Sequence, residues 1–173
     1  MARHEPFRRW ALPVAAVIAA LPAVAPAFTV AWWLNHDDVS YLIRLEQFAS
    51  GWRDGGYPRW CPGLASGKGY PLFEFYPPGL FSLALALDRL VTDQLLALKL
   101  SLLLLTFGGG LGAGLLARRL TESLAASVAA TAVFTWAPYR LCLLYERGAL
   151  AEYAGLSLLP WLLLAAELLG QAV

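Results

Sequence analysis

The sequence predicts an all-α, polytopic transmembrane bundle of about four spans, with an exported loop that carries juxtamembrane helices. Of its 173 residues, 59% are hydrophobic and 14% are charged, and the mean hydropathy is +0.58. Soluble domains carry about a quarter charged residues. Four windows approach or exceed the ~20 apolar residues with which a helix crosses a bilayer core. We therefore expect one membrane domain over residues 1–173, surrounded by membrane lipids.

Net charge and cysteine content give no support for a nucleic-acid-binding protein, a disulfide-rich domain or a cysteine metal site. The formal net charge is +1 at pH 7, which gives no electrostatic basis for nucleic acid as a partner. Cys61 and Cys142 lie in different predicted segments. Two such cysteines specify neither a disulfide framework nor a metal site, so we expect two unrelated thiols.

The first apolar stretch, residues 10–34, is the first predicted span. Arg3, Arg8 and Arg9 precede it. The four apolar windows predict a multi-pass protein of the cell membrane, which is the inner membrane in a bacterium. Because basic residues favour the cytoplasmic side, we expect its N-terminus to be cytoplasmic. A cleaved signal peptide is the alternative, since the small residues at 25–27 resemble a cleavage site. The apolar stretch is longer than the ~7–15-residue core of such signals, and either reading exports the segment that follows.

A polar insert follows over residues 35–78. Apolar residues recur at helical spacing over 38–50, which predicts a short amphipathic helix that stops at Gly51. The glycine- and proline-rich stretch 51–69 would be flexible unless its aromatic rings pack on the bundle or on the lipid surface. The rings and prolines of 73–78 predict a rigid corner that turns the chain back to the membrane.

The remaining apolar windows differ in length. Residues 78–91 are too few to span comfortably, so a juxtamembrane helix at the outer interface is expected there. The second, third and fourth spans are predicted over 94–117, 123–144 and 149–169. Lys99 lies near the outer end of the second span, where its ammonium group can extend to the interface.

Basic residues set the predicted topology. Arg118 and Arg119 end the second span and indicate a cytoplasmic turn. The polar residues 145–148 then emerge on the same side as the exported insert. If 78–91 spanned the membrane instead, residues 145–148 would be cytoplasmic and the arginine pair would lie outside, against the charge rule.

A run of glycines within the second span, over residues 108–114, predicts close helix packing. It is not a phosphate-binding loop, because it follows no strand and lacks the Lys-Ser/Thr pair of such loops. Small residues let membrane helices approach each other closely.

The insert opens with His36, Asp37 and Asp38. Two adjacent carboxylates at a membrane surface can bind a divalent cation or accept a proton from a hydroxyl group, and His36 is a candidate substrate contact. The alternative for Asp38 is the N-cap of the short helix that follows, which requires neither neighbour.

A second candidate pair is Arg147 and Glu152, a cation and an acid at the predicted start of the fourth span. Ionisable groups at membrane depth usually face a cavity, so we expect Arg147 to bind phosphate and Glu152 to be a second catalytic acid. The alternative is an ion pair at the interface, with Glu152 stabilised near a helix N-terminus.

The insert also carries candidate substrate contacts. Arg59 and Lys68 could bind a phosphate while Trp60 stacks on a sugar. The alternative is that both cations are solvated or contact lipid headgroups, with the aromatic rings as interface anchors.

After the acid that follows the first span, three motifs come in order: Gly56-Tyr57-Pro58-Arg59-Trp60-Cys61-Pro62, Gly67-Lys68-Gly69-Tyr70-Pro71-Leu72-Phe73-Glu74-Phe75-Tyr76-Pro77-Pro78 and Arg147-Gly148-Ala149-Leu150-Ala151-Glu152. Together they resemble the N-terminal part of the "6-pyruvoyl-tetrahydropterin synthase-related" family of bacterial and archaeal membrane proteins. More widely they resemble GT-C-type glycosyltransferases.

The resemblance implies an N-terminal module of a membrane glycosyltransferase with a polyprenyl-phosphate-linked sugar donor. It implies Asp37 or Asp38 as the catalytic base or as a ligand of Mg²⁺ or Mn²⁺, Arg147 as the cation that neutralises the leaving lipid phosphate, and Tyr76 as a substrate contact. Relatives have many more spans, so further membrane helices or a subunit are expected to complete the fold. A competing hypothesis is a small non-enzymatic membrane protein whose exported loop binds a partner or lipid headgroups.

Overall fold

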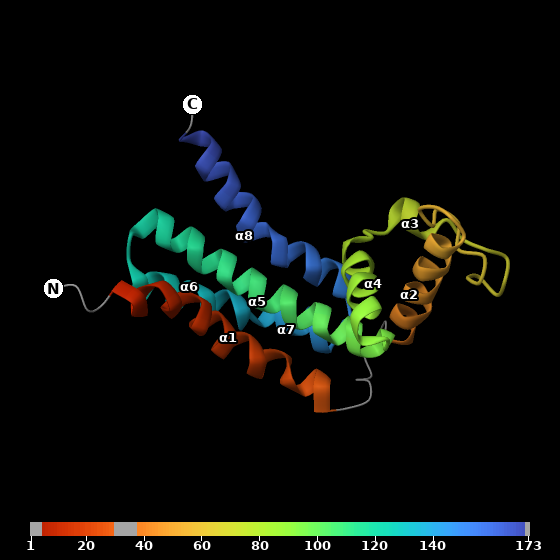
Figure 1. The fold of residues 1–173 in the computed structure, drawn as a ribbon, viewed down its shortest axis with the longest axis horizontal. Helices are drawn as coiled ribbons and strands as arrows, with labels where there is room; N and C mark the ends of the chain where they lie inside the picture. The colour runs from red at the N-terminus through yellow and green to blue at the C-terminus, as the bar shows by residue number, and fades with distance from the viewer. Residues whose placement is uncertain (1–4, 30–37, 172–173) are drawn as a thin grey trace.

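The all-α fold class is confirmed. The computed structural model of the protein describes residues 5–29 and 38–171. Over these residues the regular structure is helical, apart from one antiparallel β-bridge between Cys61 and Tyr70. The helices, in chain order (Figure 1), are α1 Glu5–Thr29, α2 Asp38–Arg53, α3 Leu72–Phe75, α4 Gly79–Val91, α5 Gln94–Thr121, α6 Leu124–Thr135, α7 Pro138–Tyr145 and α8 Leu150–Gly170.

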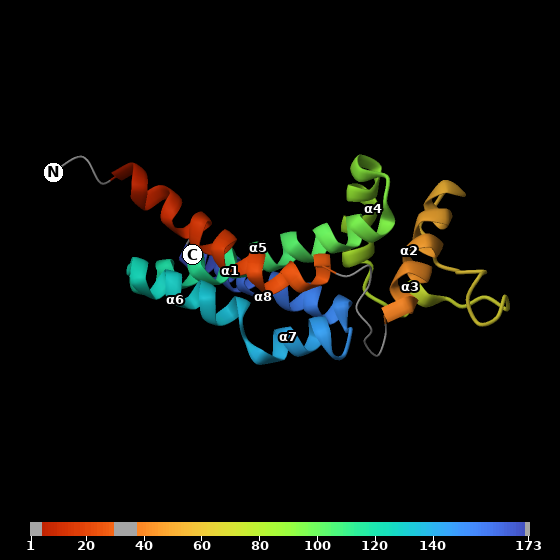
Figure 2. The ribbon, with the colours of Figure 1, turned by 90° about the horizontal axis from the view of Figure 1, so that it is seen from below.

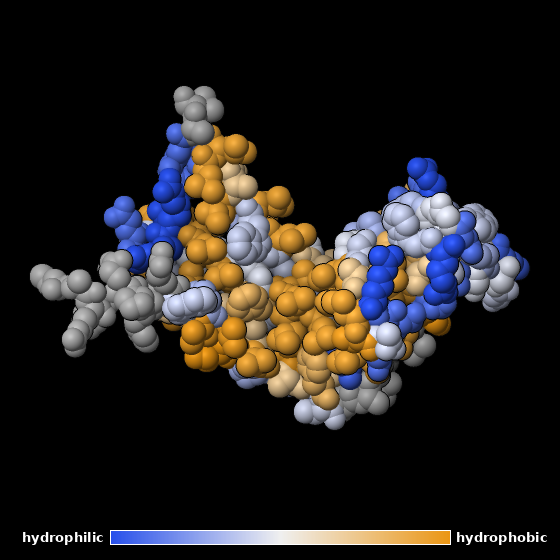
Figure 3. All heavy atoms as spheres, viewed as in Figure 1, coloured by the Kyte–Doolittle hydropathy of each residue, from blue (hydrophilic) through white to orange (hydrophobic). Residues whose placement is uncertain are grey.

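Within residues 5–29 and 38–171, four helical segments are long and apolar enough to cross a membrane, which indicates a multi-pass membrane protein. They are Trp10–Thr29, Gln94–Thr121, Leu124–Tyr145 and Leu150–Gly170. The surface between the two ends of the bundle is apolar, whereas polar residues gather at the insert and at the opposite end (Figure 3). At 13 residues α4 is too short to span, and it lies across the end of the bundle (Figure 1).

Helix α5 is the centre of the bundle and packs against α1, α4, α6 and α8. Its glycine face allows this, because the neighbouring helices occupy the space that side chains would need. A Cβ atom at Gly114 would lie 2.3 Å from Thr131 Oγ1 of α6 and 2.6 Å from Leu12 Cδ1 of α1. A Cβ at Gly112 would lie 2.8 Å from Trp161 Nε1 of α8. The glycine run therefore is a helix-packing face, as its sequence indicates.

The third span, predicted over 123–144 with a departure from regular helix at 138–140, is broken just before Pro138. Helix α6 ends at Thr135 and α7 begins at Pro138, with Ala137 in an extended conformation (ψ 128°) between them. Proline has no N–H to donate to the preceding turn, and its ring disfavours helical geometry at the residue before it.

Each span runs antiparallel to the span before it in the chain, so successive connections lie at opposite ends of the bundle (Figures 1 and 2). The end of α1, the start of α5, the end of α7 and the start of α8 all lie toward α4, and the α5–α6 turn lies at the other end (Figures 1 and 2). The insert and the residues that join α7 to α8 therefore occupy the same end of the bundle.

The insert has a small aromatic core of its own. The ring of Phe48 in α2 packs on Phe73 in α3 at 4.8 Å between centroids, and Phe73 packs on Phe81 in α4 at 5.3 Å. The prediction that Gly51 stops α2 was wrong, because the helix continues to Arg53. Gly51 instead permits close approach, since a Cβ there would lie 2.3 Å from Pro58 Cβ. Two rings of the glycine-rich stretch, Trp52 and Tyr57, pack edge-on against Phe48, so this stretch packs in part on the insert itself.

A sharp corner joins α4 to α5. Thr92 adopts a left-handed conformation (φ 54°), and Asp93 Oδ1 caps α5 by accepting from the Leu96 N–H at 3.0 Å. Lys99, expected to extend to the interface, is instead only 6% exposed, in the second turn of α5.

Replacing Gly114 by alanine should destabilise the bundle by about 1–3 kcal/mol, because the added methyl group forces α1 and α6 away from α5. Thermal unfolding in detergent measures this effect. Gly108→Ala is the matched control on the same helix, since nothing lies within 4 Å of a Cβ there. Equal unfolding temperatures for the two variants would contradict the packing role of the glycine face.

Candidate functional site

The first predicted acidic site falls largely outside the described residues. His36 and Asp37 are not among them, and Asp38 is the first residue of α2. A base or metal ligand at Asp37 or Asp38 therefore stays a prediction. Within residues 5–29 and 38–171, no group of three or more His, Cys, Asp or Glu side chains is arranged to hold a metal ion.

The structure brings Arg147 and Glu152 together at the start of α8. Arg147 Nη1 lies 3.4 Å from Glu152 Oε2 and donates to the Tyr139 hydroxyl at 3.2 Å. The same hydroxyl donates to the other oxygen of Glu152. The nearby carboxylate raises the pKa of Arg147 above its ordinary value, so the guanidinium stays charged. Both side chains of the pair are about half exposed, at 51% and 42%, so a ligand can reach them.

Tyr139 was missed as a site residue by sequence reasoning. The available signal was its position directly after Pro138, where a broken span leaves a phenol near the polar end of the bundle. Without knowledge of the α7–α8 reversal, nothing in the sequence pairs it with Glu152.

A tyrosine pair, the buried Tyr41 and the half-buried Tyr76, joins the insert to α8. The two hydroxyls are hydrogen-bonded to each other at 2.9 Å, and the Leu150 N–H donates to the Tyr41 hydroxyl at 2.9 Å. Burial raises the pKa of Tyr41, so it remains a neutral phenol at physiological pH. Tyr76, predicted to contact substrate, therefore has its hydroxyl engaged with Tyr41.

Arg44 of α2 lies over both rings of the tyrosine pair. Its guanidinium carbon is 4.8 Å from the centroid of Tyr76 and 5.3 Å from that of Tyr41. The insert is further held by Glu46, which accepts from Gln94 at the start of α5 and from Arg53. These two hydrogen bonds lower the pKa of Glu46.

The other predicted contacts lie on the loop between α2 and α3. Arg59 pairs with Glu74 at 3.5 Å, Trp60 is 57% exposed over Gly69, and Lys68 is exposed. Both ribbon views show this loop on the far side of α2 from the spans (Figures 1 and 2). The structure therefore does not bring these three side chains to Arg147.

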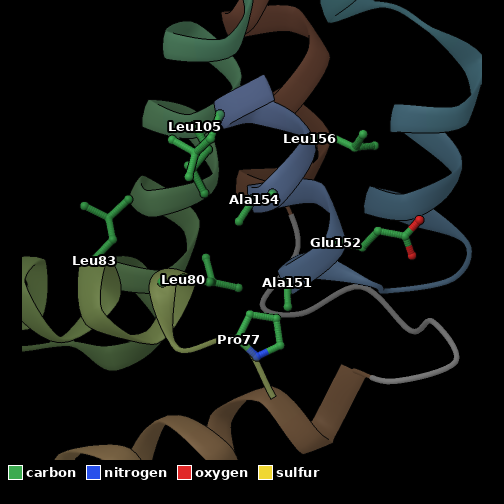
Figure 4. A pocket seen from close by; sticks show the side chains of 11 residues that line it. Pro77, Leu80, Leu83, Leu105, Ala151, Glu152, Ala154 and Leu156 are labelled. Carbon is green, nitrogen blue, oxygen red and sulfur yellow. The ribbon is translucent and has the colours of Figure 1, made fainter. Parts of the chain in front are cut away.

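An apolar cavity of about 560 Å³ lies between α4, α5 and α8 (Figure 4). It reaches from the insert along the first turns of α8. Glu152 belongs to its wall, but Figure 4 shows the carboxylate directed away from Leu80 and Leu105, on the side of α7. The lining residues are Pro77, Gly79, Leu80, Leu83, Leu105, Ala151, Glu152, Ala154, Gly155, Leu156 and Leu158.

A cation is also buried inside the bundle. Arg140 is 2% exposed, donates from Nη2 to Ser157 Oγ at 3.0 Å, and lies between the rings of Phe134 and Tyr153 at 4.5 and 4.3 Å. These contacts tie α7 to α8 just below the Arg147–Glu152 pair.

Comparison with known protein families, with curated proteins and with solved structures found no match to this chain. The case for function therefore depends on the geometry of these residues.

Replacing Tyr41 by phenylalanine should lower the free energy of unfolding by about 1–2 kcal/mol, because two hydrogen bonds of a buried hydroxyl are lost at ~1 kcal/mol each. Tyr76→Phe removes only the bond that the two hydroxyls share, so it should cost about half as much. Denaturant unfolding followed by tryptophan fluorescence measures both. A larger loss for Tyr76→Phe would contradict the assignment of Tyr41 as the residue that joins the insert to α8.

Proposed function

We propose that this chain forms the N-terminal membrane module of a GT-C-like glycosyltransferase that uses a polyprenyl-phosphate-linked sugar donor. The cavity between α4, α5 and α8 carries the proposal. Its volume, about 560 Å³, falls in the ~300–1,000 Å³ range of ligand pockets, and its wall is apolar except for Glu152. It lies at the level of the bundle and ends at the polar insert, which suits a ligand with an apolar chain and a polar head.

The polar end of this site would handle the head group of the donor. In the proposed reaction an acceptor hydroxyl attacks the anomeric carbon of the sugar, the bond from that carbon to the phosphate oxygen breaks, and the lipid phosphate leaves. Asp37 or Asp38, alone or with Mg²⁺ or Mn²⁺, would accept the hydroxyl proton. Arg147 would balance the charge of the leaving phosphate, with Glu152 holding the guanidinium in place. Fixed cations act strongly where water is scarce.

A second candidate function is partner binding by the exported loop, without catalysis. The observation that favours it is the exposure of large rings there: Trp52, Trp60 and Tyr70 are each about half exposed. A partner-binding loop requires no ligand in the cavity. Binding of a lipid phosphate in the cavity therefore distinguishes the glycosyltransferase from the partner-binding protein.

Filling the cavity should block the proposed donor. Gly155 lines the cavity, and nothing lies within 4 Å of a Cβ built on it, so the side chain of Gly155→Leu can start into the cavity without a clash at Cβ. We expect this variant to bind farnesyl phosphate at least about tenfold more weakly than the original chain, a change of ~1.4 kcal/mol. Titration calorimetry of the detergent-solubilised protein gives the affinity.

Gly170→Leu is the matched control, because Gly170 is also on α8 with open space around its Cβ but is not part of the cavity wall. If Gly155→Leu and Gly170→Leu bound farnesyl phosphate equally well, the cavity would not be the donor site.

A further inference from the structure

Among the described residues of the insert, Arg44 is the arginine without an acidic partner. Arg53 pairs with Glu46 and Arg59 with Glu74. Across the part of the chain that the structure describes, Arg44 forms no ion pair, and its Nη1 is buried without a hydrogen-bond partner. An unpaired, buried donor of a charged group is costly, so such an arrangement favours a ligand that supplies an acceptor.

The position of this guanidinium is fixed by its two aromatic neighbours. Arg44 lies over the rings of Tyr41 and Tyr76, which are themselves joined through their hydroxyls. Cation–π contacts to two rings restrict a long side chain that would otherwise sample many rotamers. The guanidinium is therefore oriented before any ligand arrives.

The same two tyrosines adjoin one end of the apolar cavity. Tyr76 directly precedes Pro77, and Tyr41 accepts from the N–H of Leu150, which directly precedes Ala151. Pro77 and Ala151 both line the cavity and lie next to each other at its end (Figure 4). Arg44 thus sits where the apolar wall meets the polar insert.

Arg147 occupies a different position. Its guanidinium is held by Glu152, and both contact Tyr139 of α7, whereas the cavity lies among α4, α5 and α8. An amphiphile seated in the cavity would bring its head group to the tyrosine pair, beside Arg44.

We infer that Arg44 is a binding residue for the phosphate group of an amphiphile whose apolar chain occupies this cavity. The inference rests on the proposed function and adds to it a second cation that faces the ligand from α2. A guanidinium suits this role because its planar N–H groups match two oxygens of one phosphate, which an ammonium group cannot do.

The test compares three probes on the full-length chain in detergent: farnesyl phosphate, farnesol and inorganic phosphate. Arg44→Met should weaken binding of farnesyl phosphate by about 10- to 100-fold, the range for loss of hydrogen bonds to a charged group, and leave the affinity for farnesol unchanged. Arg44→Lys should give an intermediate affinity, because it keeps the charge and loses the paired donors. Arg53→Met, on the same helix, is the control and should bind all three probes like the original chain.

Three results would overturn the inference. Arg44→Met could bind farnesyl phosphate normally. Arg44→Met could weaken the binding of farnesol as much as that of farnesyl phosphate, which would show a structural role of Arg44 in the tyrosine pair. Inorganic phosphate could bind as tightly as farnesyl phosphate with the same dependence on Arg44, which would show a site for free phosphate. If the original chain bound no farnesyl phosphate at all, the proposed function itself would fail, whereas binding that is indifferent to Arg44 would remove only this inference.

Discussion

The hydrogen bond between the Leu150 N–H and the buried Tyr41 hydroxyl connects the two parts of this protein. It attaches the polar insert to the first turn of the last span, and the same N–H is shared with the Gly148 carbonyl at 2.8 Å. Because α8 starts there, the bond brings Pro77 beside Ala151 and closes one end of the cavity. The position of Arg44 depends on it as well, since the guanidinium lies over the ring of Tyr41. Without this contact the insert would be tied to the bundle mainly through α4 and Glu46.

The glycine face of α5 lets the spans pack closely, and this close packing brings the buried polar groups of neighbouring helices into contact. Where α5 approaches α8, the buried hydroxyls of Thr106 and Tyr153 are hydrogen-bonded to each other. Arg140 is held between two rings and Ser157 in the same region. Polar groups in a membrane bundle turn toward its interior because lipid offers them no partner. The consequence for function is a rigid wall of α5 and α8 along one side of the cavity, while α4 closes the other.

Much of this architecture follows from the sequence, because span length and apolar content are local properties. The windows that begin at Gln94 and Leu150 could be located from composition alone. Local signals were misleading at Gly51, which resembles a helix stop but lies inside α2, where its lack of a side chain leaves room for Pro58. For the candidate site, the pairing of Arg147 with Glu152 was open to prediction since the two are close in sequence. Tyr139 and Arg44 were not, because Tyr139 meets Glu152 only through the reversal between α7 and α8, and Arg44 meets Tyr76 only through the fold of the insert.

The central claim is that the insert and the α7–α8 connection share one end of the bundle, which is what allows one site to draw on both. Labelling with a membrane-impermeant thiol reagent tests it most directly, in a chain whose Cys61 and Cys142 are replaced by alanine. Single cysteines would be placed at Asp54 in the insert, at Glu146 before α8 and at Thr121 in the α5–α6 turn, all of them exposed. The account predicts that Asp54→Cys and Glu146→Cys react from the same face of the membrane and that Thr121→Cys reacts from the other. Labelling of Glu146→Cys together with Thr121→Cys, on the face opposite to Asp54→Cys, would contradict it.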